Sequence, residues 1–180
     1  RIVKSFVDLM DGSVIVQSEP GKGSSFIVEI PCRIVSEEER IDQAEQSLPE
    51  NPLKYKRILL VEDNELNMEI ARTILQDAKA EVEVAADGAI AVAMVQKASA
   101  GYYDVVLMDI QMPKMNGYQA TKAIRKLPDE RAQVPIIAMT ANAFEEDRQA
   151  AFAAGMDDYL AKPIEIDKLL RKIVKALKKK

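Results

Sequence analysis

The chain has 180 residues, of which 48% are apolar and 30% are charged, and its formal net charge is −4. This length and composition suit a globular chain with one domain, or one domain plus a fragment. The negative charge argues against a nucleic-acid surface as the main function, so no nucleic-acid partner is expected. No apolar run approaches the roughly 20 residues needed to span a bilayer, and no signal peptide is visible.

Two residue counts limit the chemistry. There is no histidine, which excludes His-based acid–base catalysis and His-ligated metal sites. The single cysteine, Cys32, cannot form an internal disulfide, and this favours a reducing compartment. Any metal should therefore be a hard cation held by carboxylate and carbonyl oxygens. Because the chain starts at Arg1 in the middle of a pattern, we expect a piece of a longer protein.

The first 32 residues predict a helix and a hairpin. Apolar residues recur at helical spacing over residues 2–10, and Asp11-Gly12 ends the pattern. Residues 13–18 and 25–30 read as strands around a Pro-Gly turn. Such a small unit buries too little surface to be stable alone.

Residues 16–26 (VQSEPGKGSSF) resemble the end of the ATP-binding domain of sensor histidine kinases. The resemblance implies that residues 1–32 are the C-terminal remnant of that domain. The parts of the family that hold ATP would lie upstream, so no nucleotide is expected to bind this fragment. Residues 33–54 are polar and acidic, with prolines near their end, and predict a linker.

From Arg57 onward, apolar strands alternate with helical patterns. Five consecutive strand–helix units predict an α/β fold, a parallel sheet with helices on both faces and right-handed crossovers. The predicted strands are 58–61, 82–85, 105–108, 136–139 and 159–161, and the predicted helices are 66–75, 88–98, 117–127, 145–154 and 165–177.

Three acids follow strands of this predicted sheet. Asp109 ends the fully apolar strand 105–108, where a charge is costly to desolvate and is seldom present for packing. Glu62 and Asp63 follow the first strand, at the same sheet edge. They could simply cap the next helix. Three carboxylates in one small space would otherwise raise each other's pKa, and a hard cation such as Mg²⁺ would neutralise them.

Three further residues come to the same edge. Thr140 follows the fourth strand and could instead be a turn or cap residue. Lys162 ends the fifth strand, and a cis bond to Pro163 would direct it toward the acids, although most lysines are simply solvated. Tyr159 could equally be part of the core.

The joint order of these residues resembles the receiver domain of two-component response regulators. The match runs over residues 55–180 and implies a flavodoxin-like (βα)5 sheet with strand order 2-1-3-4-5. The segments that carry it are residues 60–64 (LVEDN), 108–113 (MDIQMP) with Asn116-Gly117, 139–143 (MTANA) and 155–163 (GMDDYLAKP).

The resemblance implies a role for each site residue. Asp109 would accept a phosphoryl group from a phosphohistidine. Lys162 and Thr140 would each contact a phosphoryl oxygen, and Thr140 and Tyr159 would form a switch. Mg²⁺, or Mn²⁺ in its place, would be held by Asp63, Asp109 and the backbone carbonyl of Gln111, with Glu62 bound directly or through water.

A kinase remnant joined to a receiver resembles a hybrid sensor histidine kinase. This implies a cytoplasmic fragment of a protein histidine kinase, whose parent could be anchored in the inner membrane. The fragment itself lacks the kinase site and would catalyse only its own phosphoryl uptake and loss. Its implied partners are the kinase phosphohistidine domain and a histidine phosphotransfer protein, with Leu66, Met68 and Ile70 as candidate docking residues. All three could instead be core residues, and of the three Ile70 is expected to be the closest to the core.

Two other functions are considered. A phosphatase of the haloacid-dehalogenase type needs a second Asp two residues after the nucleophile, where this chain has Gln111. A receiver that acts only as a binding module, without phosphorylation, would not need the acids, Thr140 and Lys162 that are all present.

Overall fold

The computed structural model describes residues 7, 12–19, 21, 23–31, 48–141 and 145–178. The chain divides into two compact units, residues 1–47 and 48–180, which are described separately. The helix predicted over residues 2–10 lies outside the described residues except for Val7, which is helical and buried. The predicted linker also lies largely outside them.

The described part of the first unit is a β-hairpin. Strand β1 (Ser13–Glu19) pairs antiparallel with β2 (Gly23–Glu29), and Val16 stands opposite Phe26. The two predicted strands are therefore confirmed. Gly21 and Gly23 have φ angles of 79° and 99°. A residue with a side chain would be strained in this backbone conformation.

The second unit is built on a parallel sheet. Within residues 48–141 and 145–178 this sheet has five strands in the order β4-β3-β5-β6-β7, which confirms the predicted order 2-1-3-4-5. Every residue of the central strands β5 and β6 is buried, because helices cover both faces. The strands are β3 (Arg57–Val61), β4 (Glu81–Ala85), β5 (Val105–Asp109), β6 (Ile136–Thr140) and β7 (Asp158–Ala161).

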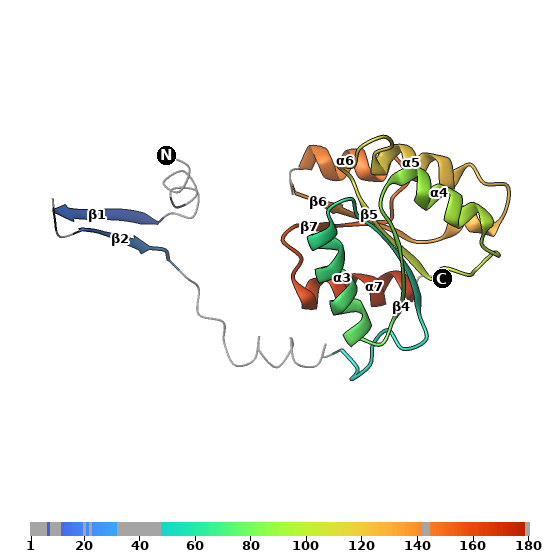
Figure 1. The fold of residues 1–180 in the computed structure, drawn as a ribbon, viewed down its shortest axis with the longest axis horizontal. Helices are drawn as coiled ribbons and strands as arrows, with labels where there is room; N and C mark the ends of the chain where they lie inside the picture. The colour runs from blue at the N-terminus through green and yellow to red at the C-terminus, as the bar shows by residue number, and fades with distance from the viewer. Residues whose placement is uncertain are drawn as a thin grey trace. The chain divides into compact units, whose positions relative to one another are not determined.

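Helices α3 (Glu65–Asp77) and α7 (Ile166–Leu177) cover one face of the sheet. Helices α4 (Gly88–Lys97), α5 (Gly117–Arg125) and α6 (Glu145–Ala153) cover the other (Figure 1). Alternate strand residues point to opposite faces, so Leu59 packs under α4 and α5 while Leu60 packs under α3 and α7.

Two features of this unit differ from the predicted organisation. A short 3₁₀ helix, η1 (Glu130–Gln133), follows α5 and was not predicted. The compact unit also begins at Leu48, earlier than the boundary at Tyr55. The reason is Leu53, which is fully buried in the core beneath α3 and α7 and donates its backbone N–H to Ala78 over 3.2 Å.

Candidate active site

The predicted site residues meet at the carboxyl edge of the sheet. Glu62 and Asp63 directly follow β3, and Asp109 is the last residue of β5. Thr140 is the last residue of β6, and Lys162 directly follows β7. Parallel strands all end on the same side, so residues far apart in the sequence converge there.

The three acids form one cluster. Each of Glu62, Asp63 and Asp109 offers a carboxylate oxygen, and these oxygens all lie within 4.8 Å of one another. Glu62 and Asp109 are buried while Asp63 is exposed. The N-cap of α3 is Asn64, whose side chain accepts the backbone N–H of Asn67, so neither acid is needed as that cap. A mostly buried set of carboxylate oxygens with one open side is a donor set that suits a hard divalent cation.

Lys162 bridges the two buried acids. Its Nζ donates to Oδ2 of Asp109 and to Oε2 of Glu62, both over 2.6 Å. The peptide bond between Lys162 and Pro163 is cis. Lys162 is thus a part of the cluster rather than a solvated surface lysine.

The charges of the cluster shift one another's ionisation. Burial raises the pKa of Asp109, the hydrogen bond from Lys162 opposes the rise, and the nearby charge of Glu62 adds to it. Burial acts to lower the pKa of Lys162, but its hydrogen bonds to Asp109 and Glu62 prevail and raise it. Lys162 therefore remains a cation at neutral pH, and an additional cation beside Asp109 would relieve the remaining repulsion.

The loop after β5 holds the Asp109 carboxylate from its other side. The backbone N–H of Gln111 donates to Oδ1 of Asp109 over 3.1 Å. The loop ends at Asn116, which caps α5 in a capping box with Gln119. A Cβ on Gly117 would lie 2.3 Å from the backbone oxygen of Asp109, so this close approach requires glycine.

The predicted switch residues lie on neighbouring strands. Thr140 is buried, and the backbone N–H of Lys162 donates to its carbonyl over 2.7 Å. Tyr159 is half-buried and makes an edge-to-face contact with Phe152, with ring centroids 6.4 Å apart. Lys172 Nζ lies 4.9 Å from the centre of the Tyr159 ring.

Two contacts near the site were not predicted. Asn67 Nδ2 donates to Oε1 of Glu62 over 3.1 Å. Lys114, at φ 64°, pairs over 3.0 Å with Asp87, the N-cap of α4. The Asp87-Gly88 turn ahead of a helical pattern is a capping signal, but no sequence pattern indicates its partner.

The candidate docking residues occupy two different environments. Leu66 and Ile70 are 70% and 48% exposed, one turn apart on α3. Met68 is half-buried against the core beneath α3 and α7. The prediction that Ile70 is closest to the core was wrong, because the buried stripe of α3 runs through Ala71 and Leu75 instead.

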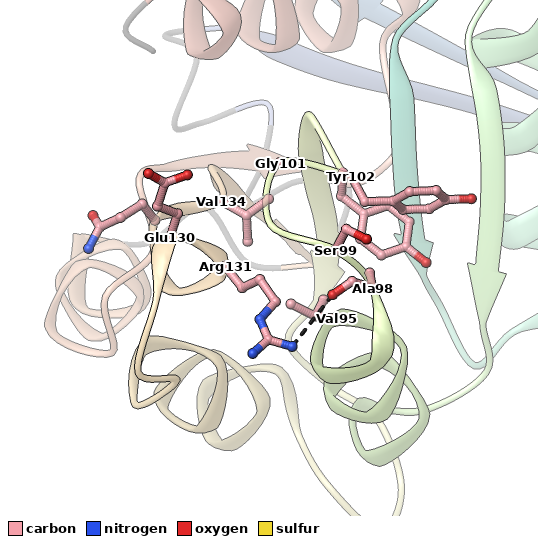
Figure 2. A pocket seen from close by; sticks show the side chains of 10 residues that line it. Val95, Ala98, Ser99, Gly101, Tyr102, Glu130, Arg131 and Val134 are labelled. Atoms are coloured by element: carbon pink, nitrogen blue, oxygen red, sulfur yellow. Dashed lines mark hydrogen bonds between the residues drawn. The ribbon is translucent and has the colours of Figure 1, made fainter.

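A cavity of about 320 Å³ lies near the amino ends of β5 and β6, whereas the acids lie at the carboxyl edge of the sheet. Figure 2 shows the side chains that line it. Val95, Tyr103 and Val134 are among its lining residues. Arg131 donates to the backbone carbonyls of Gln96 and Ala98, and thereby ties η1 to the end of α4. None of the predicted site residues lines this cavity.

Comparison with known proteins gives one family. The model of the response regulator receiver domain matches residues 58–174. The chain is 39% identical over 166 residues to the aerobic respiration control sensor protein ArcB of Escherichia coli, a match that covers 92% of this chain and 20% of ArcB. It is 36% identical over 174 residues to the autoinducer 2 sensor kinase/phosphatase LuxQ of Vibrio vulnificus, covering 93% of this chain and 19% of LuxQ.

A solved structure gives the same result. The receiver domain of sensor histidine kinase PA1611 from Pseudomonas aeruginosa, with a magnesium ion coordinated in its active-site cleft, is 40% identical. The similarity has a TM-score of 0.63 and covers 69% of this chain and 98% of that one.

The chain spans about a fifth of the length of ArcB and LuxQ, the two curated sensor proteins compared above. Among the described residues, no helix has the length and apolarity to cross a membrane.

Proposed function

Because the chain belongs to the response regulator receiver domain family, we propose that Asp109 accepts a phosphoryl group from a phosphohistidine. The observation that carries this proposal is the bridge from Lys162 to Asp109 and Glu62, beside the exposed Asp63. It combines a carboxylate nucleophile with the positive charge that a transferring phosphoryl group needs.

In the proposed step, an oxygen of Asp109 attacks the phosphorus of a phosphohistidine. The new O–P bond forms an acyl phosphate as the P–N bond breaks. The electron pair of that bond leaves with the imidazole nitrogen, which takes a proton from water. The reverse step passes the group to the histidine of a phosphotransfer protein. No histidine is needed on this side, because positioning and charge neutralisation carry phosphoryl transfer.

The neighbouring residues divide the remaining work. Lys162 faces the developing charge on the phosphoryl group, since its Nζ is already 2.6 Å from Asp109. Thr140 would donate its hydroxyl to a second phosphoryl oxygen. Movement of Thr140 toward the phosphoryl group would leave room for Tyr159 to turn inward, which would change the surface around Phe152.

Glu62, Asp63, Asp109 and the backbone carbonyl of Gln111 are the proposed holders of Mg²⁺, with Mn²⁺ as a substitute. When bound, the ion would neutralise charge on the phosphoryl oxygens. The fit is supported by carboxylate oxygens within 4.8 Å of one another. The three carboxylates need such a counter-charge, because Lys162 supplies only one positive charge.

We further propose that the chain is part of a hybrid sensor histidine kinase. The alignment with ArcB spans 166 residues and so is longer than the second unit, which means that it extends into the first. This supports residues 1–32 as the remnant of a kinase ATP-binding domain. A linker would join them to the receiver, whose compact unit begins at Leu48 rather than at the predicted Tyr55. Leu66 and Ile70 would then contact the phosphotransfer partner.

The direct test is phosphoryl uptake. The full chain is mixed with Mg²⁺ and either acetyl phosphate or a phosphorylated histidine kinase domain. Hydroxylamine-labile label on the chain, separated from the donor, is then measured. We expect uptake by the wild type, none by Asp109→Asn and none after chelation. Label that persists in Asp109→Asn contradicts the site, and absence of label in the wild type favours a binding module that works without phosphorylation.

A further inference from the structure

Asn67 extends the chain of hydrogen bonds at the site by one residue. Its Nδ2 donates to Oε1 of Glu62 over 3.1 Å, while Lys162 donates to Oε2 of the same carboxylate over 2.6 Å. Lys162 then donates to Asp109 over 2.6 Å. The order is therefore Asn67, Glu62, Lys162, Asp109, and each carboxylate oxygen of Glu62 has its own donor.

The burial of Glu62 makes these donors necessary. Its side chain is 2% exposed, so water has little access to either oxygen. A buried charged oxygen that loses its hydrogen-bond donor raises the free energy of the folded protein. The Glu62 side chain would therefore rotate toward another donor. The orientation of Glu62 thus depends on Asn67 as well as on Lys162.

The first turn of α3 holds Asn67 in place. The backbone N–H of Asn67 donates over 3.0 Å to Oδ1 of Asn64, the N-cap of the helix. In a capping box the residue at this helix position would reach back to the cap itself. Here the Asn67 side chain reaches further back, to the acid that precedes the helix.

We propose that Asn67 is a positioning residue that orients Glu62 and, through it, Lys162. The proposal rests on the proposed function, in which Lys162 must meet a phosphoryl group at Asp109. A lysine stem is flexible, and the Glu62 carboxylate is the anchor that Lys162 keeps when Asp109 becomes phosphorylated. Without Asn67 that anchor can rotate away.

The length of Glu62 is part of the same arrangement. An aspartate at this position would be shorter by one carbon–carbon bond, about 1.5 Å. Its carboxylate could not contact both Asn67 and Lys162 as Glu62 does. The role of Asn67 therefore depends on glutamate at position 62.

Two substitutions separate this role from a structural one. Asn67→Ala removes the donor, and Asn67→Asp keeps the shape but sets a negative charge against Glu62. Acids are favoured in the first turn of a helix, so a purely structural role predicts that Asn67→Asp is tolerated better than Asn67→Ala. The proposal predicts the opposite order. Thr73→Ala, on the exposed side of the same helix, is the control.

The first measurement does not require activity. In metal-free protein labelled at the lysine side-chain nitrogens, the Nζ resonance of Lys162 is followed by NMR and assigned with Lys162→Met. In the wild type and in Thr73→Ala, we expect the Lys162 ammonium protons to exchange slowly with water. In both Asn67 variants, we expect this exchange to become fast. An unchanged signal in the two folded Asn67 variants overturns the proposal.

The second measurement is uptake from acetyl phosphate, split into the maximal rate and the half-saturating concentration. We expect Asn67→Ala to lower the maximal rate about tenfold, as loss of an outer-shell partner does, and Asn67→Asp to lower it further. In a Glu62→Asp background, Asn67→Ala should change the rate less than about twofold. An equal loss in both backgrounds overturns the proposal. If the wild type takes up no label, the proposed function fails, and the NMR signal still decides the role of Asn67.

Discussion

The Lys162 ammonium donates to the Asp109 carboxylate over 2.6 Å, and the same nitrogen also bonds Glu62. One cation therefore compensates two carboxylates that are almost completely buried. This makes Lys162 important for stability in the absence of metal as well as for phosphoryl uptake.

Lys162→Met keeps a similar side-chain length but removes the charge. Glu62 and Asp109 are then left as a buried pair of like charges, and we expect the free energy of unfolding to fall by about 3 kcal/mol in metal-free protein at pH 7. Urea denaturation measures it. Adding Asp109→Asn should restore part of the loss, because it removes one of the two charges. Equal stability of wild type and Lys162→Met would contradict the bridge.

The second prediction concerns Asp87 and pH. Its carboxyl accepts hydrogen bonds from the backbone N–H of Ile90 and from the ammonium of Lys114. Both lower the pKa of Asp87, and the bond from Ile90 has the larger effect. Because the pKa of Asp87 is lower in the folded protein than in the unfolded chain, its ionised carboxylate stabilises the fold. This stabilisation is fully present above pH about 3.9, the pKa in the unfolded chain, and is lost as the pH falls through the lower pKa of the folded protein.

Asp87→Asn retains the helix cap but loses the charge pair, whereas Asp87→Ala loses both. At pH 7 we expect the order of stability to be wild type, then Asn, then Ala. The gap between wild type and Asp87→Asn should narrow as the pH falls below about 4. Urea midpoints over a pH series measure this, and a gap independent of pH would contradict the ion pair.

The third prediction concerns Gly117. Its missing Cβ would lie 2.3 Å from the carbonyl oxygen of Asp109, and this neighbour is backbone that cannot move aside freely. Gly117→Ala should lower the free energy of unfolding by about 1–3 kcal/mol and slow phosphoryl uptake, because it displaces the nucleophile. Thermal unfolding and labelling measure the two effects.

Gly101→Asn is the matched control. Gly101 has φ 75° but nothing lies within 4 Å of a Cβ built there, and asparagine tolerates this conformation. We expect a change below about 1 kcal/mol and unaltered uptake. Since Gly117 itself has no positive φ, a loss of uptake in Gly101→Asn equal to that in Gly117→Ala would mean that the effect does not come from close approach to Asp109.

Most of the fold and the catalytic candidates were predictable because their signals are local. An apolar strand that ends in a charge, as at Asp109, indicates that the strand is buried and that the charged residue lies at the carboxyl edge of the sheet. Lys162 was predicted to face the acids, but its second contact with Glu62 depends on how two distant strand ends approach each other. The Asn67 contact was missed for the same reason, since an asparagine in a first helical turn is usually only solvated.

The boundary and the docking face show another limit. Leu53 is one apolar residue among polar and proline residues, and only tertiary packing makes it core. Ile70 was placed near the core because the sequence puts it on the same apolar side of the predicted helix as Ile74 and Leu75. Helix α3 packs instead through residues at the spacing of Ala71 and Leu75, which turns Ile70 outward.

The last prediction uses this difference along α3. Leu66 and Ile70 are exposed and one turn apart, so Leu66→Ser and Ile70→Ser should change the free energy of unfolding by no more than about 0.5 kcal/mol. Met68→Ser, by contrast, removes a half-buried side chain from the core contact and should lower it by about 1–2 kcal/mol.

Phosphoryl transfer should show the reverse pattern. If Leu66 and Ile70 contact the phosphotransfer partner, their serine variants should take up label from acetyl phosphate at the wild-type rate. They should then pass it to the partner at least tenfold more slowly, as loss of an apolar interface anchor predicts. Met68→Ser should transfer normally once it is folded. Stopped labelling reactions with a purified histidine phosphotransfer protein measure the rate, and wild-type transfer by both surface variants would place the docking face elsewhere on the receiver.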